Sequence, residues 1–162
     1  MAHKVIRKWF WVWEFEKEEQ WLNEMAHAGW VLEHTGFARF EFTSCEPEEY
    51  IIRLEYHERD EDYTRFIEET GAEQVGRLFN WVYFRKKASE GAFDLLSDLD
   101  SRIRHLDKIG KMLSGVSIAN LVLGLTNPLG KINFLCAALL LYAAGRIHGK
   151  KEELEKERLL RE

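Results

Sequence analysis

An internal repeat constrains the fold of this 162-residue chain more than any other feature of its sequence. A shift of 42 positions, without gaps, aligns residues 9–42 with residues 51–84. Identical residues coincide at glycine and phenylalanine positions: Gly29 with Gly71, Phe37 with Phe79, and Phe42 with Phe84. The hydrophobic pattern agrees along the whole length of both segments. The first half of the chain is therefore predicted to contain two copies of one structural unit.

Each copy is predicted to run strand, helix, strand. Alternating apolar residues indicate strands, and amphipathic stretches that end at a glycine indicate helices. The predicted strands span residues 5–14, 30–43, 50–57 and 73–86, and the predicted helices span 16–29 and 60–71. This order, βαββαβ, is that of an α+β domain of the ferredoxin-like class, with two helices on one side of an antiparallel sheet.

The other side of this predicted sheet is rich in aromatic residues. Successive side chains of a strand point to opposite faces, so Trp9, Trp11 and Trp13 are expected in one row. The repeat aligns this row with Ile51, Arg53 and Glu55, which is not a core pattern. The usual 4-1-3-2 strand order adds further residues to this open face, so the candidate partner-binding residues are Trp9, Trp11, Trp13, Trp81, Tyr83, Arg39 and Arg53.

An aromatic face of this kind requires a cover. The amphipathic stretch 92–109, which places Phe93 and Leu96 on one helical stripe, is one candidate. A second copy of the domain and a small apolar ligand or peptide are the alternatives.

The last third of the chain contains two charge-free apolar runs, residues 112–125 and 132–145, joined by a turn with Asn127, Pro128 and Gly130. Positive residues flank both outer ends, as expected of a transmembrane hairpin whose two termini lie in the cytoplasm. Each run is about 14 residues, which is shorter than the roughly 20 that cross a bilayer. A water-soluble helical hairpin packed against another subunit is the alternative.

These patterns divide the chain into four parts. They are a ferredoxin-like domain (1–88), an amphipathic connecting helix (89–110), an apolar helical hairpin (111–149) and a charged tail (150–162). Residues 1–88 carry 12 Lys and Arg against 18 Asp and Glu, and this acidic balance argues against nucleic-acid binding. The N-terminus does not resemble a signal peptide. Cys45 and Cys136 are expected to be free thiols in a reducing compartment.

No motif in the sequence indicates a catalytic site, a metal site or a cofactor site. The six histidines lack metal-ligand spacing, and no glycine-rich phosphate loop is present. Paired acids such as Glu18 and Glu19 are expected to be solvated rather than to form an acid–base couple. We therefore expect no enzymatic activity, no cofactor and no metal.

Three segments, WLNEMAHAGWVL, CEPEEYIIRLEY and GRLFNWVYFRK, followed by two apolar segments, carry a family resemblance. The chain resembles the bacterial family catalogued as domain of unknown function 2812 over nearly its whole length. That resemblance implies a small protein of Firmicutes and their relatives with C-terminal membrane segments, often encoded near PadR-type transcription regulators. It implies no activity and no functional residues.

Together these features predict a non-enzymatic, membrane-anchored binding or regulatory protein that presents an aromatic sheet face to a partner protein or a second copy. The helix 92–109 and the partner would compete for this face. The expected location is the bacterial cell membrane, with both termini in the cytoplasm. The alternative is a soluble, cytoplasmic, oligomeric ligand-binding sensor or enzyme assembled through the apolar hairpin.

Overall fold

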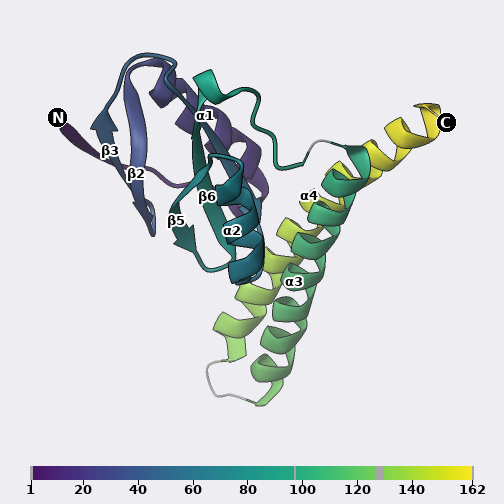
Figure 1. Ribbon diagram of the computed structural model, residues 1–162. Helices are drawn as coiled ribbons and strands as arrows, with labels where there is room; N and C mark the ends of the chain where they lie inside the picture. The colour runs from purple at the N-terminus through teal and green to yellow at the C-terminus, as the bar shows by residue number, and fades with distance from the viewer. Residues whose placement is uncertain (1, 97, 127–129, 162) are drawn as a thin grey trace. The chain divides into compact units, whose positions relative to one another are not determined.

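A computed structural model describes residues 2–96, 98–126 and 130–161 of the chain (Figure 1). The chain forms two compact units, Met1–Leu95 and Leu96–Glu162. The first unit contains strands and helices, and the second contains two long helices. The predicted α+β class with a C-terminal helical hairpin is therefore confirmed.

The first unit contains two three-stranded antiparallel sheets, each with one helix. The first copy consists of β1 (His3–Arg7), the 3-10 turn η1 (Val12–Glu14), α1 (Phe15–His27), β2 (Trp30–Gly36) and β3 (Arg39–Ser44). The second consists of β4 (Tyr50–Tyr56), α2 (Glu61–Glu69), β5 (Glu73–Leu78) and β6 (Trp81–Lys87), followed by the 3-10 turn η2 (Ala88–Glu90). The strand orders, β1-β3-β2 and β4-β6-β5, are equivalent.

The repeat seen in the sequence is also present in the backbone. Gly29 and Gly71 end the two helices with φ values of 82° and 90°, a left-handed conformation that favours glycine. Each hairpin then contains an irregularity in strand register, between Leu32 and His34 in the first and between Gln74 and Gly76 in the second. These positions differ by 42 residues in both cases, so the two copies share local geometry as well as hydrophobic pattern.

The single four-stranded ferredoxin-like sheet is not what the chain forms. The predicted strand 30–43 is the hairpin β2–β3, and the predicted strand 73–86 is the hairpin β5–β6. Ala38 and Phe79 take positive φ values of 51° and 54° at the two tips, where the chain reverses without an Asn-Gly signal. The 4-1-3-2 strand order fails because the unit has six strands in two sheets.

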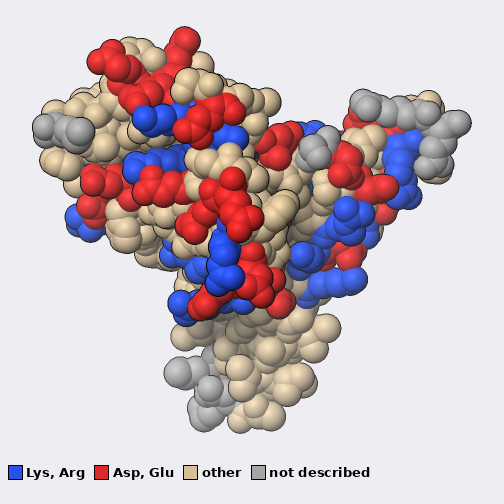
Figure 2. Space-filling model, in the orientation of Figure 1, with Lys and Arg blue, Asp and Glu red and all other residues tan. Residues whose placement is uncertain are grey.

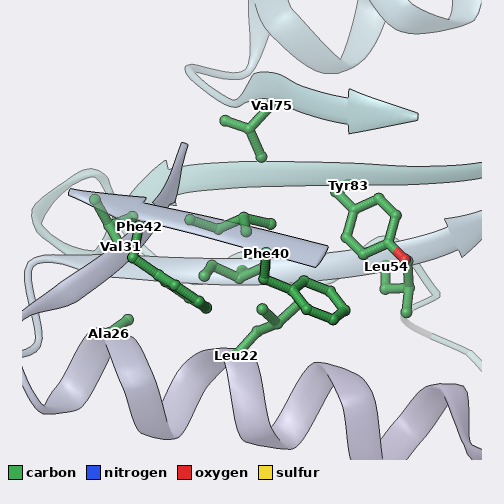
Figure 3. Packing of buried hydrophobic residues seen from close by; sticks show 10 residues of the cluster. Leu22, Ala26, Val31, Phe40, Phe42, Leu54, Val75 and Tyr83 are labelled. Atoms are coloured by element: carbon green, nitrogen blue, oxygen red, sulfur yellow. The ribbon is translucent and has the colours of Figure 1, made fainter. Parts of the chain in front are cut away.

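Each helix covers its own sheet. Leu22 and Ala26 of α1 pack with Phe40 and Phe42 of β3 in the larger hydrophobic core (Figure 3). The second copy forms a smaller core, in which Ile67 of α2 packs with Val82 and Phe84 of β6, with Ala72 and with Phe93.

The second sheet is buried on both faces. Leu54, Val75 and Tyr83 belong to the same core as α1 and β3, on the side of the sheet away from α2 (Figure 3). The two sheets also contact each other through β2 and β5. As a result, Trp81 and Tyr83, which the sequence predicted to lie on an open face, point into the interior of the first unit.

The second unit is an antiparallel pair of helices, α3 (Leu99–Thr126) and α4 (Gly130–Arg161). Ser117 Oγ donates a hydrogen bond to the Ala137 carbonyl at 3.0 Å, and Lys151 Nζ lies 2.6 Å from Asp107 Oδ1. The helix predicted over 92–109 begins only at Leu99, where the Ser101 amide donates to Asp98 Oδ1 at 2.8 Å. Phe93 is instead buried in the smaller core of the first unit.

Candidate functional site

The N-terminal tryptophans form an exposed aromatic cluster with the tip of the first hairpin. Trp9 and Trp11 are 51% and 46% exposed, and Phe37 is 68% exposed. The Trp9 ring lies 5.6 Å from the Trp11 ring and 5.3 Å from the Phe37 ring, both in edge-on geometry. Trp13, which is half-buried, stacks on Trp11 at 5.1 Å. We call Trp9, Trp11, Trp13 and Phe37 the aromatic cluster.

A loop, rather than a strand, displays these rings. Strand β1 ends at Arg7, and the Glu14 amide donates to the Trp11 carbonyl at 2.7 Å to form a 3-10 turn. The Lys8 amide donates to the Ala38 carbonyl at 3.2 Å and so holds the loop against the hairpin tip. The prediction that residues 5–14 form one strand is therefore wrong, although Trp9 and Trp11 are exposed as expected.

Phe10, which lies between these tryptophans, points inward. Its ring packs against Trp21 and Phe40, at 5.5 and 6.2 Å. Lys8 Nζ lies 4.4 Å above the Trp21 ring and 4.9 Å above the Phe10 ring, an arrangement that favours a cation. The loop is thus fixed from below by Phe10 and Lys8, which keeps the tryptophans on the surface.

A shallow hollow of about 450 Å³ lies beside the aromatic cluster. Its lining contains three cationic side chains and no carboxylate: Arg7, Lys8, Trp9, Phe37, Ala38 and Arg39. Arg39 pairs with Glu41 at 2.7 Å, outside the hollow. This combination of aromatic rings and positive charge is suited to a partner surface that is apolar and acidic.

Three of the candidate partner-binding residues do not lie on this surface. Tyr83 is only 3% exposed, and its hydroxyl donates to Glu18 at 2.7 Å. Trp81 is half-buried between the rings of Phe15 and Tyr56. Arg53 Nη1 donates to the Ile52 carbonyl at 3.1 Å. Trp81 and Tyr83 are absent from this surface because α1 and the first sheet cover the face of the second sheet that carries them. Arg53 lies on the other face, in register with Phe84, and pairs with Glu19 of α1 at 3.5 Å.

The adjacent carboxylates Glu18 and Glu19 are also more buried than the sequence suggested. Burial raises the pKa of Glu18, and the hydrogen bond from Tyr83 lowers it in part. Burial likewise raises the pKa of Glu19, which accepts a hydrogen bond from the Leu54 amide at 2.8 Å. Both side chains thus hold α1 against the second sheet, and the expectation that they are solvated is wrong.

The hairpin of α3 and α4 exposes an unusually apolar surface. In the most apolar 18-residue stretch of each helix, only 22% of the stretch is buried in α3 and 17% in α4. Large apolar residues are exposed along both helices: Val116, Ile118, Leu121, Val122, Leu123, Leu125, Ile132, Phe134, Leu135, Leu139, Leu141 and Tyr142. On the face drawn in Figure 2, the end of the hairpin near its turn is uncharged, and Lys131, at the start of α4, is the only Lys, Arg, Asp or Glu in residues 112–126 and 130–145. Both helices are long and apolar enough to cross a membrane.

Among the described residues, no group of three or more His, Cys, Asp or Glu side chains is arranged to hold a metal ion. Cys45 and Cys136 are both free thiols. The two features that single out this molecule are therefore the aromatic cluster and the apolar hairpin.

Comparison with known families decides where the chain belongs. A family model described as "Protein of unknown function (DUF2812)" matches residues 14–118, which is more than half of the chain. The chain belongs to the DUF2812 family. Searches of curated proteins and of solved structures find no match. The DUF2812 match includes both copies of the repeat from α1 onward and the first part of α3.

The structure explains the WLNEMA segment of this DUF2812 protein, in which Asn23 has a role that sequence reasoning missed. The Asn23 amide group forms two hydrogen bonds of 2.9 Å with the Ile52 backbone, one to its N–H and one to its carbonyl. Asn23 and Glu19 thus satisfy the outer edge of β4, which would otherwise be open to pairing with another chain. Phe37 was missed as well, because a continuous strand predicted over 30–43 does not place it at a hairpin tip.

Proposed function

We propose that this DUF2812 protein is a non-enzymatic, membrane-anchored binding protein. The hairpin of α3 and α4 would lie in the bacterial cell membrane, and the first unit would present the aromatic cluster to a partner protein on the cytoplasmic side. The observation that carries the proposal is the exposed apolar surface of both helices. Positive residues at both outer ends of the hairpin support cytoplasmic termini.

Membrane anchoring is tested by flotation of the full-length protein with phospholipid vesicles. The variant Val122→Lys with Leu139→Lys places two charges on exposed apolar positions, each of which costs about 2.5–3.5 kcal/mol at the centre of a membrane helix. We expect this variant to stay at the bottom of the gradient while the unmodified protein floats. The matched control, Phe66→Lys with Phe79→Lys, changes two exposed residues of the first unit and is expected to float.

The rival function is a soluble oligomer that buries the same apolar surface between subunits. Under that function the unmodified protein would be soluble without detergent as a discrete oligomer, and it would not float. An exposed apolar surface on α3 and α4 is suited both to a lipid bilayer and to an interface between subunits. The flotation result therefore separates the membrane-anchored protein from the soluble oligomer.

The binding role rests on the aromatic cluster. Exposed tryptophans on a fixed loop next to Arg7 and Arg39 have the composition of protein-binding surfaces. The segment 92–109 would not compete with the partner for this cluster, because its residue Phe93 packs in the smaller core instead. The remaining question is whether the partner is another protein or a second copy.

Site-specific photo-crosslinking tests this role in cells. A photoreactive residue in place of Trp11 is expected to form a crosslink, whereas the same residue in place of the exposed Phe66 is not. A product of twice the protein's own mass would identify a second copy as the partner. Equal crosslinking at both positions would contradict a specific role for the aromatic cluster.

A further inference from the structure

The charged residues of the α3–α4 hairpin are arranged in layers along its length. Residues 112–126 and 132–145 contain no charge. The helical segments next to these apolar stretches, residues 104–111 of α3 and 146–151 of α4, contain six Lys or Arg residues and one carboxylate. These cations are Arg104, Lys108, Lys111, Arg146, Lys150 and Lys151, which we call the cationic layer. Carboxylates become frequent only beyond this layer, toward the outer ends of the two helices.

The register of the two helices brings these cations to one level. Gly110 lies opposite Ile147, whose side chain would be 3.8 Å from a Cβ at that glycine. One turn away, Lys151 pairs with Asp107 at 2.6 Å. Because α3 and α4 are antiparallel, both contribute cations next to the apolar part of the hairpin. Figure 2 shows Lys and Arg side chains on the hairpin beside its apolar part.

The cationic layer is partly exposed and only partly neutralised. Lys108, Lys111 and Arg146 are all exposed. Asp107 is the sole carboxylate in the layer and is engaged by both Lys111 and Lys151 at 2.6 Å. Among the described residues, Lys108 and Arg146 form no ion pair. Lys108 and Arg146 are therefore available to a ligand, and Lys111 and Lys151 share a single carboxylate within the layer.

We propose that the cationic layer binds the headgroups of anionic phospholipids. The proposal rests on the membrane anchoring proposed above and adds the lipid class. A bilayer presents its negative headgroup phosphates directly next to its apolar core, and the hairpin presents cations directly next to its apolar surface. Long Lys and Arg side chains at the end of a membrane helix reach this headgroup region. Zwitterionic lipids lack the net charge that the layer complements.

The expected strength follows from the number of cations. Each Lys or Arg near an anionic membrane surface strengthens binding by about fivefold, so three together contribute on the order of a hundredfold. We expect the full-length protein in a non-ionic detergent to bind phosphatidylglycerol about a hundredfold more tightly than phosphatidylcholine. Native mass spectrometry during titration with each lipid measures this ratio.

Two variants isolate the cationic layer from the overall charge of the protein. Lys108→Gln, Lys111→Gln and Arg146→Gln together are expected to reduce the preference to within a few-fold, and Lys151 still neutralises Asp107 in this variant. The control is Lys17→Gln, Arg65→Gln and Lys87→Gln, which removes three exposed cations of the first unit. The control is expected to retain the full preference, and circular dichroism checks that both variants fold.

The outcomes separate this proposal from the one on which it rests. Equal binding of the two lipids by a protein that floats with vesicles would overturn the lipid preference and leave membrane anchoring intact. Failure of the unmodified protein to float would overturn both. Inorganic phosphate that competes as effectively as phosphatidylglycerol would show an anion site rather than a lipid surface, and it would also overturn the proposal.

Discussion

At the scale of single residues, polar side chains of α1 organise the first unit. Asn23 and Glu19 bind the backbone of β4, and Glu18 accepts from the hydroxyl of Tyr83. All three come from one helix and satisfy groups of the second sheet. The two repeat copies are thus joined by hydrogen bonds as well as by apolar packing.

Loss of the Asn23 amide is expected to destabilise the first unit. Asn23→Ala leaves the N–H and carbonyl of Ile52 without their partners, and a partly buried group left unsatisfied costs about 1–3 kcal/mol. The free energy of unfolding, followed by tryptophan fluorescence in denaturant, measures this effect. Gln20→Ala, at an exposed position on the same helix, should change it by less than about 0.5 kcal/mol. Equal effects of the two changes would contradict the role given to Asn23.

Glu18 is expected to make stability fall as the pH rises. Burial raises its pKa in the folded protein above the ordinary value of 4.5, so the folded state holds the proton more tightly than the unfolded state. Stability is then lost as the pH rises from about 4.5 through the raised pKa. Glu18→Gln keeps an acceptor for Tyr83 but cannot ionise, so it should gain stability relative to the unmodified protein between pH 4 and pH 7.

Denaturant unfolding of both proteins at several pH values measures this difference. Glu69→Gln, on the exposed end of α2, serves as the control and should follow the unmodified protein at each pH. A constant difference between Glu18→Gln and the unmodified protein across this range would show that the pKa of Glu18 is the same in the folded and unfolded states, which would contradict the raised pKa.

At the scale of elements, the close approach of the two hairpin helices depends on their small residues. A Cβ on Gly130, the first residue of α4, would clash with the carbonyl oxygen of Gly124 in α3. Backbone cannot move aside as readily as the end of a side chain. By contrast, a Cβ on Gly115 meets no atom within 4 Å.

Gly130→Ala is therefore expected to weaken the hairpin, and Gly115→Ala is not. The expected cost of forcing extra volume into this contact is about 1–3 kcal/mol. Unfolding of the full-length protein in mixed micelles, with an increasing fraction of sodium dodecyl sulfate, measures the midpoint for each variant. Equal shifts of the unfolding midpoint in Gly130→Ala and Gly115→Ala would contradict the role given to the contact between Gly124 and Gly130.

Sequence reasoning succeeded for elements whose signal is local or repeated. Gly29 and Gly71 mark both helix ends, and the apolar runs mark the hairpin. It failed where the outcome depends on contacts between distant segments. Alternation correctly placed Tyr83 opposite Val82 and Phe84, but it could not show that α1 and β3 bury the Tyr83 side. The reversals at Ala38 and Phe79 lack an Asn-Gly or Asp-Gly pair, although Asn80 follows Phe79, so the hydrophobic pattern predicts one strand where each hairpin lies.

At the scale of the whole molecule, the two units differ in the kind of surface that they expose. The first unit carries the acidic excess of the chain and one aromatic cluster, whereas α3 and α4 expose apolar residues along much of their length. A water-soluble protein seldom leaves so large an apolar surface uncovered. The proposed function and the lipid preference both depend on membrane anchoring of this surface.

Spin-label accessibility tests membrane anchoring most directly. In full-length protein with Cys45→Ser and Cys136→Ser, a nitroxide is attached at Val122→Cys, Leu139→Cys or Phe66→Cys, all of which are exposed positions. In vesicles, the account predicts that labels at 122 and 139 collide with oxygen far more than with a water-soluble nickel chelate, and that the label at 66 does the opposite. Equal access of the nickel chelate at all three positions would contradict it.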